Sequence, residues 1–103
     1  MSMSDKYSND KILNTMIKYL NVHFSSHNWH IREGRTHFGN IIACDFVGED
    51  VINNHDPKII YGEVSQTKNG AYENLICSFL NVFKNKFSSK YEFIMKMELM
   101  GWV

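Results

Sequence analysis

The sequence predicts an α+β fold, a single domain in which two helices pack on one face of a mostly antiparallel sheet. Two stretches with apolar residues at helical spacing and four β-rich or alternating stretches support this prediction, in the order α-β-β-β-α-β. At 103 residues with 44% apolar side chains, the chain is long enough for one apolar core and too short for two. Residues 1–103 are therefore expected to form one domain.

The chain begins with a polar segment and a helix. Residues 1–8 are polar and are expected to be disordered. Behind Asn9 and Asp10, which can cap a first turn, apolar side chains recur every three or four residues and predict a helix over residues 9–24. The polar residues 25–28 then end this helix.

Three strands are expected in the middle of the chain. Residues 29–32 form a short strand that leads into a hairpin turn at Gly34. Residues 40–47 are β-rich and apolar on both faces, which is typical of a central strand. After a polar loop over residues 48–57, the third strand covers residues 58–65.

The last two elements are predicted from two different spacings of apolar side chains. A wide apolar stripe over residues 71–87, preceded by Thr67, Lys68 and Asn69, predicts a long helix that covers the sheet. Apolar side chains then alternate with mostly polar neighbours over residues 91–99, which predicts a final strand. A right-handed crossover through the helix would set this strand parallel to the third one.

Charge and cysteine content restrict the function. Eleven basic side chains balance eleven acidic ones, so no global field draws the chain to nucleic acid or to an anionic membrane. Cys44 and Cys77 are far apart in apolar surroundings, which predicts two buried, reduced thiols. The sequence has no apolar signal region and no apolar run of about 18 residues. We therefore expect a soluble, intracellular protein in a reducing compartment, the cytoplasm.

Motifs for catalysis or metal binding are weak. His23, His27 and His30 could be zinc ligands by spacing, but histidines near a helix C-terminus are favoured by the helix dipole without a metal. No nucleophile with an adjacent base and no phosphate-binding glycine loop can be placed. The sequence therefore predicts no catalytic residue and no cofactor.

Two blocks of the sequence resemble a known family. Gly-Arg-Thr-His at residues 34–37 is similar to the turn between the first two strands of a double-stranded RNA-binding domain. Thr-Lys-Asn-Gly-Ala-Tyr at residues 67–72 is similar to the lysine-rich start of that domain's second helix. With the first helix included, the resemblance covers residues 9–87.

The resemblance implies an RNA-binding site in two parts. The turn would reach a minor groove, and the helix start would hold phosphates across the major groove. The residues implied are Arg35, Thr36 and His37 in the turn, and Lys68 and Asn69 at the helix start.

The chain also departs from the pattern of that family. Of three expected lysines only Lys68 is present, because Asn69 and Tyr72 replace the others, and Arg35 replaces a proline. Each lost phosphate contact weakens RNA binding, which makes a protein partner more natural. An apolar contact surface for such a partner would comprise Tyr61, Met95, Met97, Met100 and Trp102.

The expected element order also resembles the core of the PD-(D/E)xK nuclease superfamily. Asp45 and Glu63, in the second and third strands, would then hold a divalent cation. That family places a lysine two residues after the second acid, where this chain has Ser65. A metal-dependent nuclease is therefore the alternative prediction.

The sequence as a whole predicts a small non-catalytic binding module that acts on a macromolecular partner, either another protein or structured RNA. A homodimer is one form that the protein partner could take. Neither a membrane nor a small-molecule cofactor is expected. A compact inhibitor or immunity-type protein that blocks one specific partner fits the size and neutrality equally well.

Overall fold

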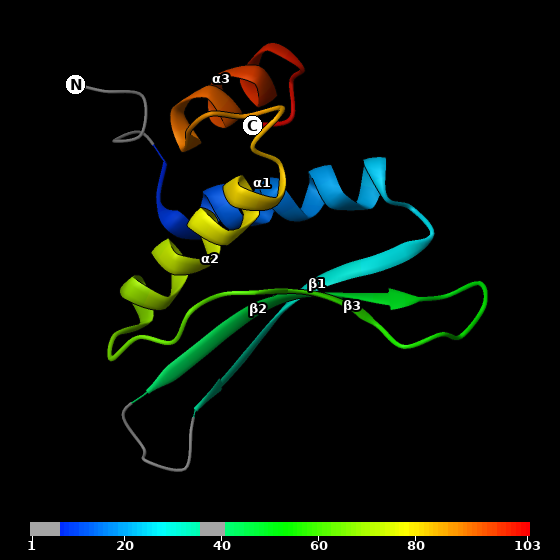
Figure 1. Ribbon diagram of the computed structural model, residues 1–103. Coiled ribbons are helices and arrows are strands. Elements are labelled where there is room, and N and C mark those ends of the chain that lie inside the picture. Colours follow the sequence, from blue (N-terminus) through cyan, green and yellow to red (C-terminus); the bar gives the residue numbers. More distant parts are fainter. Residues whose placement is uncertain (1–6, 36–40) are drawn as a thin grey trace.

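The computed structural model describes residues 7–35 and 41–103, and their elements follow the order α-β-β-β-α-α (Figure 1). The helices are α1 (Asn9–His23), α2 (Lys68–Val82) and α3 (Lys90–Leu99), and the strands are β1 (His27–Arg35), β2 (Ile42–Asp50) and β3 (Lys58–Tyr61). The sheet is antiparallel with the order β1-β2-β3. The predicted α+β single domain and the central place of the second strand are therefore confirmed. No helix in the described residues has the length and apolar character needed to cross a membrane.

The elements form three layers. Figure 1 shows α1 and α2 on one face of the sheet, as predicted, and α3 on the far side of these two helices. Phe46 of β2 and Phe79 of α2 are fully buried between sheet and helices, with ring centroids 5.9 Å apart. Phe93 of α3 extends the same core, because its ring lies 5.3 Å from Phe79 and 6.1 Å from Tyr19 of α1. One continuous apolar core therefore joins the three layers.

The two faces of the sheet have different environments. Side chains alternate between the faces along a strand, so Cys44 and Phe46 face the helices while Asp45 and Val47 face the other way. No described helix or strand covers that second face (Figure 1). Asp45 lies there beside Arg32 and is 8% exposed.

The predicted turn at Gly34 is wrong. β1 continues to Arg35, and Gly34 is paired with Ala43 of β2, because the ladder of the hairpin extends this far. Residues 36–40 lie outside the described residues. At the other end of the hairpin, Gly48 belongs to β2 rather than to the predicted loop. It lies opposite Trp29, whose indole occupies the space above it.

The predicted final strand is also wrong, because residues 90–99 form α3, and the strands of the described residues form an antiparallel sheet without a crossover. The Ser89 side chain caps this helix by accepting a hydrogen bond from the Glu92 amide at 3.2 Å. Phe93, Ile94 and Met97 are buried together, at helical spacing. Apolar side chains do alternate over residues 91–99, but those that are buried lie on one face of a helix.

Several other element boundaries also differ from the prediction. Ser8 rather than Asn9 or Asp10 caps α1, by accepting from the Lys11 amide. Tyr7 donates to the Glu98 carboxylate of α3, so residues 7 and 8 are not disordered. α2 begins at Lys68 and ends at Val82, and β3 ends at Tyr61.

Candidate functional site

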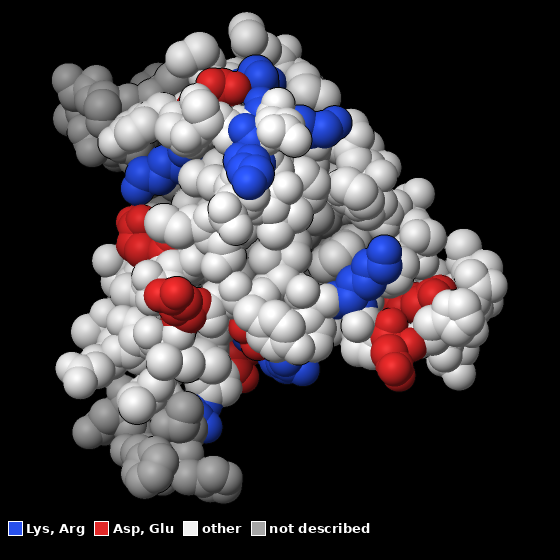
Figure 2. All heavy atoms as spheres, viewed as in Figure 1, with Lys and Arg blue, Asp and Glu red and all other residues white. Residues whose placement is uncertain are grey.

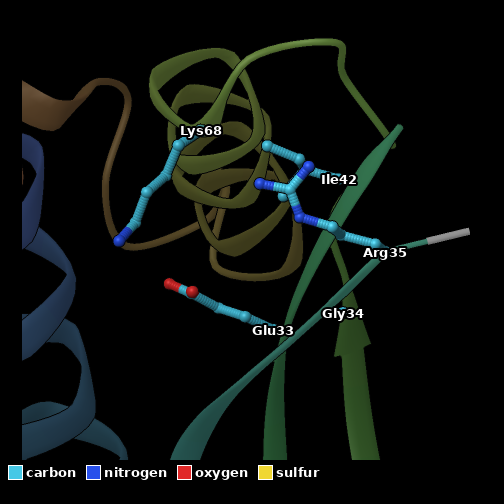
Figure 3. A pocket seen from close by; sticks show the side chains of 5 residues that line it. All are labelled: Glu33, Gly34, Arg35, Ile42 and Lys68. Atoms are coloured by element: carbon cyan, nitrogen blue, oxygen red, sulfur yellow. The ribbon is translucent and has the colours of Figure 1, made fainter. Parts of the chain in front are cut away.

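The start of α2 faces the adjoining ends of β1 and β2 across an open hollow of about 320 Å³ (Figure 3). Arg35 is the last residue of β1, and Lys68 is the first residue of α2. In Figure 3 the Arg35 side chain extends from the strand toward α2, and the Lys68 side chain points from α2 toward the carboxylate of Glu33. Gly34 and Ile42 complete the lining. Two cationic groups from distant parts of the sequence therefore meet at one hollow.

The first turn of α2 adds to the positive potential of this hollow. Thr67 caps the helix, and its hydroxyl accepts a hydrogen bond from the Gly70 amide at 3.0 Å. Among the described helices, α1 and α3 carry Asp10 and Glu92 in their first turns, whereas α2 carries no acid there. A lysine at this end opposes the helix dipole, so Lys68 is placed against the local electrostatic preference. Such local violations are expected at functional sites.

Glu33 and Tyr72 link β1 to α2 beside this hollow. The Tyr72 hydroxyl donates a hydrogen bond to the Glu33 carboxylate. This hydrogen bond is the main cause that raises the pKa of Tyr72, with burial and the charge of Glu33 adding to it, so the phenol keeps its proton. The Lys68 ammonium lies 5.5 Å from the centre of the Tyr72 ring. Tyr72 thus fixes the Glu33 carboxylate by a hydrogen bond and interacts with the Lys68 ammonium through its ring.

The other residues implied for RNA binding lie differently. Asn69 lines a neighbouring hollow with residues of the α1 start, and its side-chain oxygen accepts a hydrogen bond from Asn9 at 2.8 Å. Thr36 and His37 lie outside the described residues. Of the five residues, the structure therefore brings Arg35 and Lys68 together at one hollow, with Asn69 beside them.

The residues expected to form an apolar contact surface do not form one surface. Tyr61 is 67% exposed at the end of β3, while Met95 and Met100 are half exposed in and after α3, in the layer farthest from the sheet. Met97 is 1% exposed, so its predicted place on a contact surface is wrong, because it lies on the buried face of a helix. The Trp102 ring packs against Tyr19 and His23 at the edge of the core.

Asp45 and Glu63 have separate surroundings. The Asp45 carboxylate accepts hydrogen bonds from Arg32 at 3.2 Å and from the Gly62 amide at 3.1 Å. Glu63 lines a different hollow with residues of α2, including Cys77. The described residues contain no group of three or more histidine, cysteine or acidic side chains placed to hold a metal ion. The arrangement of Asp45 is that of a structural ion pair.

The two cysteines differ in environment. Cys44 is fully buried in the core, and burial, with smaller effects of Glu33 and Asp45, raises its pKa to about 11. Cys77 is exposed on α2, so the prediction of two buried thiols is wrong for it. The apolar run around residue 77 was the misleading signal, because this position falls on the solvent side of a helix that buries only its opposite face.

The chain matches no model of a known protein family, no curated protein and no solved structure. The chemistry of the candidate site rests on its own side chains. A guanidinium offers five N–H donors in a planar fork, and an ammonium adds a compact charge, a combination suited to a phosphate group. Glu33 and Tyr72 were missed as site residues, because a contact across 39 positions leaves no local signal in the sequence.

Proposed function

We propose that this protein is a small non-catalytic binding module that holds the phosphate backbone of structured RNA at the hollow between Arg35 and Lys68. The convergence of these two cations, from the end of β1 and the start of α2, is the observation that carries the proposal. Phosphate contacts by arginine, lysine and helix N-termini supply most of the sequence-independent affinity for nucleic acid.

The element order supports RNA as the macromolecule. From α1 to α2 the order is α-β-β-β-α, with both helices on one sheet face. The end of β1 and the start of α2 lie side by side, as the resemblance to a double-stranded RNA-binding domain implies. In such a domain these two places contact the same duplex through its shape and phosphates.

The charge distribution predicts weak binding. The chain has no net charge, and Figure 2 shows acidic and basic side chains interspersed over the visible face. Glu33 also places a carboxylate in the hollow, where it repels a phosphate. With so few cations, we expect a dissociation constant on the order of 0.1 mM at physiological salt, the weak end for sequence-independent binding, and tighter binding at low salt.

The proposal is tested by titrating the protein against a fluorescent RNA duplex of about 20 base pairs, which exceeds the span of one such domain. Lys68→Glu should weaken binding by about tenfold or more, because it removes one phosphate contact and adds repulsion. Lys84→Glu is the matched control, an exposed lysine just beyond α2, and should change binding by less than about twofold. Equal losses in both variants would contradict the proposal.

Glu33→Gln gives a test of opposite sign. The amide keeps an acceptor for the Tyr72 hydroxyl and removes the negative charge from the hollow. RNA binding should become several-fold tighter. Unchanged binding in this variant would show that phosphate does not enter the hollow.

A further inference from the structure

A second hollow, of about 400 Å³, lies at the other end of α2, beside β3. It is apolar apart from one cation, and its lining comprises Leu20, Phe24, Trp29, Lys58, Ile59, Ile60, Val82 and Phe83. Val82 is 55% exposed and Phe24 is 42% exposed, so apolar surface faces solvent here. The 15 residues of α2 separate this hollow from Lys68 by about 20 Å at 1.5 Å per residue, which makes the two sites independent.

The edge of the sheet runs along this hollow. β3 pairs with β2 on one side, and no described strand pairs with it on the other. The Gly62 amide donates to the Cys44 carbonyl at 3.2 Å, so the alternation of an antiparallel ladder turns the backbone of Ile60 toward β2. The backbone N–H and C=O groups of Ile59 and Tyr61 then point outward from the sheet. An extended segment laid along β3 would meet two donors and two acceptors.

We propose that this edge and hollow bind an extended segment of a partner protein, which adds a fourth strand beside β3. A large apolar side chain of the segment enters the hollow beside Ile60. A carboxylate two residues away faces Lys58, which is the one charged side chain among the described residues that line the hollow. The apolar and acidic residues of the segment are two positions apart because Lys58 and Ile60 lie on the same face of β3. There they pair with Gly48 and Phe46 of β2.

Charge complementarity favours a foreign segment over a second copy of this chain. A second copy that offered its own β3 would bring Ile60 and Lys58 to the same face, and no carboxylate would meet the Lys58 ammonium. Two lysines near one apolar hollow repel each other. An acidic residue in a segment of another protein removes this conflict.

The test uses capped eight-residue peptides of alternating threonine and valine that carry one leucine and, two residues later, one glutamate. Binding is measured by anisotropy of a labelled peptide, and the bound edge by NMR shifts of the Ile59 and Tyr61 amides. The leucine–glutamate peptide should bind about tenfold more tightly than peptides with alanine for leucine or lysine for glutamate. Lys58→Glu should reverse the preference between glutamate and lysine.

Val82→Asp and Val22→Asp form a matched pair of variants. Both valines are exposed on helices, at 55% and 58%, but only Val82 lines the hollow. Val82→Asp should abolish peptide binding while Val22→Asp leaves it intact, and neither should change RNA binding. Failure of every peptide to bind, or a preference that Lys58→Glu leaves unchanged, would overturn the proposal. A dimer in sedimentation that Val82→Asp dissociates would also overturn it, because the occupant would then be a second copy.

Discussion

Gly48 and Gly34 lie in neighbouring strands but have opposite steric surroundings. A Cβ on Gly48 would lie 2.7 Å from the Trp29 ring, whereas a Cβ on Gly34 would meet nothing within 4 Å. Gly48→Ala should therefore lower the free energy of unfolding by about 1–3 kcal/mol, since the indole must move in a packed core. Gly34→Ala should raise it by about 0.5–1 kcal/mol by restricting the unfolded chain. Urea denaturation measures both, and a loss of stability in Gly34→Ala would contradict the extended pairing of β1.

The thiols give a second prediction at the residue scale. At pH 8, Cys77 should react promptly with a thiol reagent and Cys44 only after unfolding. Burial raises the pKa of Cys44 from 9.0 to about 11, so the folded state keeps a proton that the unfolded state loses. The resulting stability is present below pH 9 and is lost as the pH rises toward 11.

Comparing the wild type with Cys44→Ala isolates this effect. Between pH 9 and 11, the free energy of unfolding should decline less steeply in the variant than in the wild type. The loss of the buried sulfur also lowers stability at neutral pH, but that loss does not change the slope. Two thiols that react at the same rate in the native protein would contradict the burial of Cys44.

The site residues show what the sequence could and could not predict. Arg35 and Lys68 were selected because residues 34–37 and 67–72 resemble two contact segments of a double-stranded RNA-binding domain, and their binding to RNA stays a prediction. Glu33 and Tyr72 could not be found, since only the fold brings β1 and α2 together. Met97 was placed on a contact surface because its segment was predicted to be a strand. In the helix that the segment forms, Met97 lies on the buried face.

At the scale of elements, the long helices and the strands were predictable because their apolar spacing is unambiguous. Residues 90–99 were not, because aromatic and methionine side chains at every second position also fit a helical face. The sequence did contain a helix signal. Ser89 and Glu92 have the spacing of a capping box, and Glu92 pairs with Lys96 one turn later at 3.1 Å.

The cap of α3 can be tested with two adjacent serines. Ser89→Ala should lower the free energy of unfolding by about 1 kcal/mol, because the Glu92 amide loses its acceptor. Ser88→Ala should cost less than about 0.5 kcal/mol, because Ser88 is exposed and its hydroxyl donates to the partly exposed carboxylate of Glu92. Equal effects in thermal denaturation would contradict Ser89 as the N-cap.

At the scale of the whole molecule, the three layers place two unlike surfaces at opposite ends of α2. The hollow of Arg35 and Lys68 is cationic, and the hollow beside β3 is apolar with an open strand edge. The two proposals together predict that RNA and a protein segment bind at the same time, at opposite ends of α2. The third layer, formed by α3, could not be predicted, because its placement follows from aromatic packing between distant parts of the chain.

The salt dependence of RNA binding is the sharpest test of a phosphate site between Arg35 and Lys68. The logarithm of the association constant for duplex RNA should fall linearly with the logarithm of the salt concentration. Lys68→Ala should reduce this slope by about one, since one phosphate contact is lost, while Lys84→Ala should leave it unchanged. A slope that Lys68→Ala does not alter, or no binding to the duplex at low salt, would contradict the phosphate site at this hollow.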